Sequence, residues 1–302
     1  MCIQWFPGHM YRSKKAIQNR LKSIDIVIEV LDARLPASSI SPLLANLSQN
    51  KAKLKLLNKA DLADASVTQK WLDYFNAQAD TKALAITSNH TSKNKLIIEQ
   101  SKNLVPNRRS MDKPLRIMIC GVPNVGKSSL INNLLGRKVT KTGNEAGITK
   151  DEQHLVLTDD IWLYDTPGML WEKIIIPESG YRLATAGSVG KNAYNDEEVA
   201  LHLLDYLKTN YLQKLSSRYK LDNLDINMPS DELLTLLAKK RGTILSKGCI
   251  DYQKISEMVI QDFRTGRMGR ISLEKPEEWL IWQNSALQRE EERNSKKKIK
   301  KS

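Results

Sequence analysis

The chain has 302 residues, of which 41% are hydrophobic and 27% are charged, and a mass of 34.3 kDa. This length and composition are typical of a soluble globular protein with room for two domains. No stretch approaches the ~18–20 consecutive apolar residues that a membrane span needs, so the sequence predicts no integral membrane segment.

The cysteines and the N-terminal residues predict the compartment. Cys2, Cys120 and Cys249 lie far apart in the sequence and suggest neither a disulfide framework nor a pair of metal ligands. The first residues lack the basic and then apolar layout of a secretory signal. We therefore expect a cytoplasmic protein in a reducing environment.

The net charge of +13 is distributed unevenly along the chain. Residues 1–176 hold 25 basic and 16 acidic side chains, residues 177–285 hold 15 of each, and residues 286–302 hold 7 and 3. Positive charge concentrated in this way favours a polyanionic partner, such as nucleic acid or an anionic surface. A solvated basic face with a solubilising tail would give the same pattern.

Short apolar runs alternate with helical stretches over the first two thirds of the chain. The expected strands are Ile24–Leu31, Lys53–Leu57, Ala83–Thr87, Leu115–Cys120, His154–Leu157 and Ile161–Tyr164. Amphipathic segments such as Ser66–Gln78 and Lys93–Leu104 lie between them. The alternation predicts an α/β fold with a doubly wound, mostly parallel sheet. The polar segment Asn103–Pro114 is expected to connect two halves of that sheet at the surface.

From about Pro177 onward the spacing of apolar residues becomes helical. We therefore divide the chain into three parts. Residues 1–176 form the α/β domain with a basic N-terminal segment, residues 177–285 form a small helical domain, and residues 286–302 form a basic tail that we expect to be disordered.

A phosphate-binding motif follows the fourth expected strand. Residues 121–128 read Gly-Val-Pro-Asn-Val-Gly-Lys-Ser and match the P-loop pattern G-x-x-x-x-G-K-[ST] between a strand and a helix. In such a loop, backbone N–H groups and the helix N-terminus face phosphate oxygens. Lys127 is expected to bridge the β- and γ-phosphates, and the Ser128 hydroxyl to coordinate Mg²⁺. Further nucleotide contacts are expected from Asn124, Val125, Gly126 and Ser129.

Two downstream elements complete the expected phosphate site. Asp165-Thr-Pro-Gly168 ends an apolar run, so Asp165 is expected to hold Mg²⁺ through water and the Gly168 N–H to face the γ-phosphate. Thr149 lies in a polar loop between this element and the P-loop. It is expected to be the second protein ligand of Mg²⁺ when a γ-phosphate orders the loop.

The choice of base is predicted by an N-K-x-D element at residues 58–61. The carboxylate of Asp61 can accept hydrogen bonds from N1–H and N2–H of guanine, a pair of donors that adenine does not offer. Asn58 is expected to donate toward the O6/N7 edge and Lys59 to cover the ring. Thr87 and Ser88 are expected to add contact to O6. Together with the P-loop, this element predicts a GTPase and disfavours an ATP-using enzyme.

The order of these elements is unusual, because base recognition precedes phosphate binding, whereas Ras-like proteins have the reverse order. The sequence therefore predicts a circularly permuted GTPase domain in which residues 103–114 join the original ends. In this order the segment 165–168 leads into the helical residues 177–285. We expect the nucleotide to bias the position of that helical domain.

The permuted order resembles that of the ribosome biogenesis GTPase A family. The same family is indicated by Trp-Phe-Pro-Gly-His-Met at residues 5–10, by Asp-Ala-Arg-Leu-Pro at residues 32–36 and by the helical C-terminal half. The resemblance covers roughly residues 1–285. It implies a GTPase that binds GTP, GDP and Mg²⁺ and assists late assembly of the large ribosomal subunit. Ala146 stands where a proline is usual, and this departure leaves Thr149 in place.

The segment after Gly168 lacks the usual catalytic side chain, so we expect a catalytic group to be supplied from elsewhere. Met169 follows Gly168 at the position where Ras-type GTPases carry a glutamine that orients water, so we expect slow intrinsic hydrolysis. The resemblance implies that His9 is catalytic and orients or deprotonates water on the ribosome. A structural role of His9 in the first helix is the alternative.

The expected partner is the large ribosomal subunit, with its rRNA and ribosomal proteins, and we expect the protein to be a monomer. Basic segments at Tyr11–Lys22, Lys239–Arg241 and Arg264–Arg270 are the expected RNA contacts. Asn124 is compatible with a K⁺ site beside the nucleotide. The alternative function is a GTP-dependent regulatory switch that binds a protein or an anionic membrane.

Overall fold

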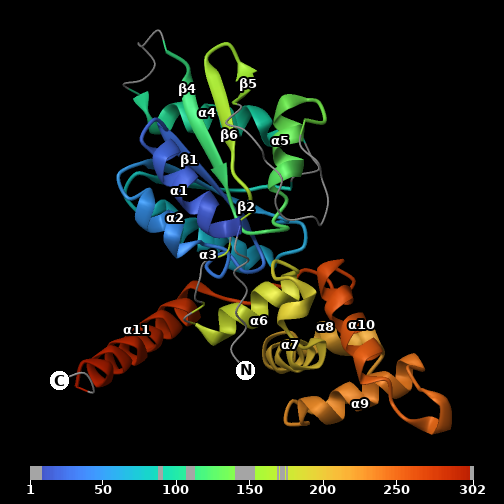
Figure 1. The fold of residues 1–302 in the computed structure, drawn as a ribbon. Coiled ribbons are helices and arrows are strands. Elements are labelled where there is room, and N and C mark those ends of the chain that lie inside the picture. Colours follow the sequence, from blue (N-terminus) through green and yellow to red (C-terminus); the bar gives the residue numbers. More distant parts are fainter. Residues whose placement is uncertain are drawn as a thin grey trace.

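The computed structural model describes residues 9–87, 91–106, 113–139, 154–168, 170, 174 and 176–299. An α/β domain is followed by a helical domain that lies against one edge of the sheet (Figure 1). Among these residues there is no helix with the length and apolar character that a bilayer crossing requires.

The α/β domain is built on a six-stranded sheet with the strand order β3-β2-β1-β4-β6-β5. The strands are β1 (Ile26–Asp32), β2 (Ala52–Asn58), β3 (Thr81–Ala85), β4 (Leu115–Cys120), β5 (Leu155–Thr158) and β6 (Ile161–Asp165). Neighbouring strands are parallel except for the antiparallel pair of β5 and β6. The predicted doubly wound, mostly parallel sheet is therefore confirmed.

One predicted strand is displaced along the chain. The sequence predicts a strand over Ala83–Thr87, whereas β3 begins at Thr81, which pairs with Lys53 of β2. Ile86 lies beyond the strand, and its N–H donates to the carbonyl of Leu57 at 2.8 Å. Pairing with β2 thus sets the limits of β3 and leaves residues 86 and 87 at the loop edge of the sheet.

Helices cover both faces of the sheet, because successive strand residues point to opposite sides. On one face lie α1 (His9–Leu21), α2 (Pro42–Leu47) and α3 (Ala65–Asn76), over residues such as Val27 and Leu31. On the other face, α4 (Asn94–Leu104), preceded by the turn η1 (Thr91–Lys93), and α5 (Lys127–Leu135) pack with residues such as Ile28 and Val30.

The helical domain shares a hydrophobic core with the second face of the sheet. Its elements are α6 (Pro177–Ala186), η3 (Lys191–Ala193), α7 (Asp196–Asn210), α8 (Leu212–Tyr219), α9 (Ser230–Arg241), η4 (Ser246–Gly248), α10 (Tyr252–Arg264) and α11 (Pro276–Ile299). Helix α7 contacts α6, α9 and α10, and buried leucines such as Leu203 and Leu237 join the same apolar cluster as Ile28. The predicted helical C-terminal region is confirmed.

Helix α11 projects away from the rest of the molecule (Figure 1). Its backbone is helical as far as Ile299, whereas the sequence predicted disorder over residues 286–302. Gln, Glu, Arg and Lys dominate this stretch, and these residues are good helix formers even without a packing partner. A charged composition therefore does not prevent this helix from continuing.

Residues 271–274, between α10 and α11, join the helical domain to the α/β domain. The N–H groups of Ile271 and Leu273 donate to the carbonyls of Leu62 and Arg34 at 2.9 and 2.6 Å. The carboxylate of Glu274 accepts hydrogen bonds from the N–H and the hydroxyl of Ser38 at 3.0 and 2.6 Å. Burial raises the pKa of Glu274 despite the nearby guanidinium of Arg182.

We expect Trp71→Ala to lower the free energy of unfolding by ~3–5 kcal/mol. Trp71 is fully buried, its ring centroid lies 5.4 Å from that of Phe75, and its indole N–H donates to the carbonyl of Glu274 at 3.1 Å. Urea denaturation would measure the change. Ile281→Ala, at a position 65% exposed on α11, should change the free energy by less than ~0.5 kcal/mol. Equal effects of the two variants would contradict an anchoring role for Trp71.

Candidate nucleotide-binding site

The predicted nucleotide motifs meet at the carboxyl edge of the sheet. β2 ends at Asn58, β4 at Cys120 and β6 at Asp165, and β1 lies between β2 and β4. Parallel strands bring their carboxyl ends to one edge, where open α/β sheets bind ligands. Elements that are far apart in the sequence therefore face one site.

The P-loop connects β4 to α5 and directs the N-terminus of α5 toward this edge. Gly126 has a left-handed φ of 94° immediately before the helix begins at Lys127. Gly121 lies so close to β1 that a Cβ atom would stand 2.6 Å from the carbonyl oxygen of Val30. The first turn of α5 contains Lys127, Ser128 and Ser129, and its N–H groups are suited to phosphate oxygens.

Lys127 forms an ion pair with Asp165 at the end of β6. The two side chains are only 10% and 13% exposed. Asp165 thus neutralises the ammonium group that the motif assigns to the β- and γ-phosphates. Gly168 lies against the same loop, because a Cβ atom there would stand 3.1 Å from Cα of Pro123. The D-T-P-G segment and the P-loop are therefore neighbours, as predicted.

The oxygen donors at this position fit Mg²⁺. Ser128 lies in the first turn of α5 and Asp165 beside Lys127, and Mg²⁺ is commonly bound by one or two protein oxygens together with substrate phosphates. Over the part of the chain that the structure describes, no group of three or more His, Cys, Asp and Glu side chains forms a metal cage. This donor set suits a metal that binds together with a nucleotide.

The base-recognition element is tied to the P-loop by two hydrogen bonds. The side-chain N–H of Asn58, a residue 1% exposed, donates to the carbonyl of Val125 at 2.6 Å. The ammonium group of Lys59 donates to the carbonyl of Asn124 at 2.8 Å. Asn58 and Lys59 therefore hold the two halves of the predicted site together, a role that motif reasoning did not assign to them.

Asp61 lies on the accessible side of this element. It is exposed, and its carboxylate accepts a hydrogen bond from the hydroxyl of Thr87 at 3.1 Å. This contact joins the two segments that the sequence assigned to the base. Ser88 and Thr149 lie outside the described residues, and so does the side chain of His9, whose backbone begins α1.

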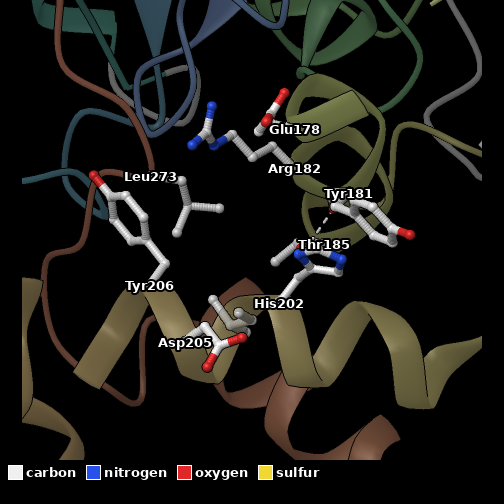
Figure 2. Close-up of a pocket in the computed structure, with 9 residues that line it drawn as sticks. Glu178, Tyr181, Arg182, Thr185, His202, Asp205, Tyr206 and Leu273 are labelled. Carbon is white, nitrogen blue, oxygen red and sulfur yellow. Dashed lines mark hydrogen bonds between the residues drawn. The ribbon is translucent and has the colours of Figure 1, made fainter. Parts of the chain in front are cut away.

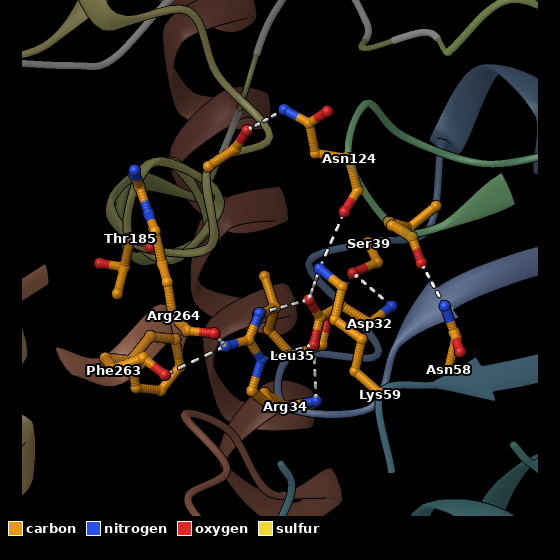
Figure 3. A network of polar contacts seen from close by, with 12 residues as sticks. Asp32, Arg34, Leu35, Ser39, Asn58, Lys59, Asn124, Thr185, Phe263 and Arg264 are labelled. Atoms are coloured by element: carbon orange, nitrogen blue, oxygen red, sulfur yellow. Dashed lines mark hydrogen bonds and ion pairs between the residues drawn. The ribbon is translucent and has the colours of Figure 1, made fainter. Parts of the chain in front are cut away.

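Asp32 and Arg34 form the buried centre of the site, although the sequence assigned them no role (Figure 3). Nε and Nη2 of Arg34 donate to the Asp32 carboxylate at 2.9 and 2.8 Å, and Lys59 approaches the same carboxylate at 2.9 Å. Burial alone would raise the pKa of Asp32, but these two cations outweigh burial and hold that pKa well below its ordinary value. A charged residue at the end of a buried strand is the signal that marks this position.

Arg264, the first residue of a basic segment predicted to contact RNA, makes hydrogen bonds within the protein. Its Nη2 and Nε donate to the carbonyls of Ala184 and Thr185 at 2.6 and 2.8 Å, at the C-terminus of α6. Arg267, by contrast, is 61% exposed and lies 3.6 Å from Asp262. The basic segment Arg264–Arg270 thus begins with a residue that joins α10 to α6.

A hollow between α6 and α7 is separate from the nucleotide motifs (Figure 2). It has a volume of about 210 Å³ and includes Arg182, whose guanidinium lies 3.9 Å from the ring centroid of Trp282. Tyr181 and His202 also line it and stack with ring centroids 3.6 Å apart. None of its lining residues belongs to the P-loop, the N-K-x-D element or the D-T-P-G element.

Comparison with known proteins identifies the family of the chain. A family model described as "50S ribosome-binding GTPase" matches residues 116–240. Ribosome biogenesis GTPase A of Priestia megaterium is 39% identical over 288 residues, which cover 92% of this chain and 98% of that protein. Mitochondrial ribosome-associated GTPase 1 of Mus musculus is 31% identical, with 90% of each chain covered. The chain belongs to the ribosome biogenesis GTPase A family.

The solved structure of a relative agrees with the fold. The crystal structure of GNP-bound YlqF from T. maritima matches 88% of this chain and 99% of its own, with a TM-score of 0.63 and 25% identity. Membership of this family confirms a circularly permuted GTPase domain that binds and hydrolyses GTP, and it implies Mg²⁺ as the companion of the nucleotide.

We expect Asp165→Asn to lower GTP affinity in Mg²⁺ by about tenfold or more, because the carboxylate that orients a metal-bound water is lost. In EDTA the affinity should stay the same or rise, since Lys127 no longer has a competing carboxylate. Calorimetry in both buffers would measure this difference. Asp160→Asn removes an exposed aspartate that pairs with Lys102 and should change neither value. Equal losses in both buffers would contradict a metal-binding role for Asp165.

Proposed function

We propose that this protein is a GTP-dependent assembly factor of the large ribosomal subunit that binds its particle in the GTP-bound state. The GTP-binding part of this proposal rests on the hydrogen bond from Asn58 to Val125, because this bond joins the base-recognition element to the phosphate-binding loop in one site. The names of the matched family and relatives, which refer to 50S ribosome binding and ribosome biogenesis, support the ribosomal part.

In this proposal one end of the site binds the guanine base and the other end binds the phosphates. Asp61 accepts N1–H and N2–H of guanine beside Thr87 and Ser88, while Lys59 covers the ring. At the other end, phosphate oxygens are bound by the Lys127 ammonium group and by the backbone of Val125, Gly126, Ser129 and Gly168. Ser128, Thr149 and Asp165 would hold Mg²⁺, whose chemistry here is to neutralise phosphate charge. A K⁺ ion beside Asn124 would add a further positive charge at the phosphates.

A basic surface on the helical domain supports RNA as part of the partner. Lys220 follows α8, and Lys239, Lys240 and Arg241 end α9; all four are exposed, and we call them the α8–α9 basic cluster. Nζ of Lys240 donates to the carbonyl of Lys220, and Nη2 of Arg241 donates to that of Arg218 at 3.3 Å, so the cluster is compact. Neighbouring cations of this kind attract RNA phosphates. We expect a cytoplasmic monomer to be the active form.

The decisive experiment is co-sedimentation with large ribosomal subunits, with GDP and with a nonhydrolysable GTP analogue. Association should need the GTP analogue and should weaken steeply between ~50 and ~200 mM salt. Replacing Lys239, Lys240 and Arg241 together by Gln should lower the affinity by about tenfold or more and reduce the salt dependence.

The matched control replaces Lys82, Lys95 and Lys113, which are exposed on the α/β domain, by Gln. This control should behave as the parent protein does. A protein that binds GTP but stays out of ribosomal fractions in both nucleotide states would instead support the alternative, a switch for a protein or an anionic membrane.

We propose that His9 supplies the missing catalytic group on the ribosome. His9→Ala should reduce ribosome-stimulated hydrolysis by ~10²–10⁴-fold, because a positioned general base is lost, while GTP affinity stays unchanged. His202→Ala, at an exposed histidine of α7, is the control and should keep stimulated hydrolysis. Stimulated turnover that persists in His9→Ala would remove His9 from the mechanism.

A further inference from the structure

The P-loop residue Asn124 is held in place by a contact from outside the GTPase motifs. Its φ of 60° is left-handed, a conformation that asparagine tolerates better than most residues. Its carbonyl accepts the hydrogen bond from Lys59, and its side-chain N–H donates to the carbonyl of Gly187 at 2.7 Å. Gly187 belongs to the helical domain, at the end of α6. One residue of the phosphate loop therefore contacts both domains.

The carbonyl of Gly187 is positioned by the way in which α6 ends. Gly187 has a φ of 81°, its N–H donates to the carbonyl of Ala184 at 3.0 Å, and the N–H of Ser188 donates to that of Leu183 at 2.8 Å. These two hydrogen bonds are the Schellman pattern, in which a glycine ends a helix in the left-handed conformation. The direction in which this carbonyl points is thus built into the helix end.

The same helix end is joined to the base-recognition element by a second route. The Arg264 guanidinium donates to the carbonyls of Ala184 and Thr185, and the Arg264 carbonyl accepts a hydrogen bond from Nη1 of Arg34 at 3.4 Å. Arg34 pairs with Asp32, and Asp32 pairs with Lys59. The contacts form a closed ring that passes through Asn124, the end of α6, Arg264, Arg34, Asp32 and Lys59 (Figure 3).

We propose that Gly187 is a positioning residue for nucleotide binding, which acts by holding Asn124 and with it the phosphate loop. The helical domain then contributes to nucleotide affinity although it supplies no residue of the GTPase motifs. This inference builds on the GTP binding proposed above and adds a residue to it. Because linkage is reciprocal, a nucleotide in the P-loop stabilises the end of α6 by the same factor.

Gly187→Ala tests the proposal. The left-handed φ is unfavourable for alanine, and the added Cβ would stand 3.4 Å from Cζ and Nε of Arg264, so we expect relief of the backbone strain to shift the Gly187 carbonyl relative to Asn124. We expect the dissociation constant for GDP, measured by calorimetry on the full chain, to rise about tenfold, which corresponds to the loss of one well-placed hydrogen bond.

Gly242→Ala is the matched control. Gly242 ends α9 with a φ of 66°, and nothing lies within 4 Å of a Cβ atom built there. The two variants therefore place alanine in the same kind of strained helix end, but only Gly187 touches the P-loop. GDP affinity of Gly242→Ala should stay within about twofold of the parent. Equal GDP affinities of Gly187→Ala and Gly242→Ala would overturn the proposal. Any change in affinity would then be a general effect of alanine at a strained helix end.

The reciprocal effect is measured on the parent protein, so this test does not depend on whether a variant folds. GDP should slow the hydrogen exchange of the Gly187 and Ser188 amides, while the Gly242 amide should exchange as before. Tight GDP binding without slower exchange at Gly187 and Ser188 would overturn the coupling and leave the proposed function standing. A parent protein that binds neither GDP nor GTP would overturn the proposed function itself.

Discussion

A buried carboxylate organises the nucleotide edge of this protein. Asp32 is 1% exposed, and an unpaired charge in such a place would cost several kcal/mol. Two cations offset this cost, and each has a second partner. Lys59 also binds the carbonyl of Asn124 in the P-loop, and Arg34 also binds the carbonyls of Phe263 and Arg264 in the helical domain. The need to keep one carboxylate paired therefore holds three parts of the chain in one arrangement.

Circular permutation makes the helical domain a neighbour of the nucleotide edge of the sheet in two places. It begins after the D-T-P-G segment, and the end of its first helix, α6, returns to the P-loop at Gly187. Residues 271–274, between α10 and α11, bind the carbonyls of Leu62 and Arg34 in the α/β domain. The shared apolar cluster adds a common core between the two domains. Direct contacts therefore link the phosphate loop and the α/β domain to the helices.

The charge of the helical domain shows why composition alone is a poor guide to surfaces. Residues 177–285 hold equal numbers of acidic and basic side chains, and so are neutral by sequence. Charges of both signs are buried in this domain: Asp262 and Glu274 are 3% and 0% exposed, and Arg182 and Lys208 are 8% and 7% exposed. The exposed lysines and arginine of the α8–α9 basic cluster are left facing solvent. The basic surface therefore comes from the grouping of these side chains at the ends of α8 and α9, and not from the net charge of the domain.

The sequence by itself determined the fold class, the family and the three motifs of the site, because each depends on a short stretch of backbone. The left-handed Gly126 before Lys127 and the periodicity of the strands are local features of this kind. The tertiary structure alone decided the limits of β3, which follow from pairing with β2, and the inward role of Arg264. It also decided the roles of Asp32 and Arg34, since Arg34 and the carbonyl of Phe263 are 229 positions apart. No local pattern encodes a contact between groups so distant along the chain, and only packing brings them together.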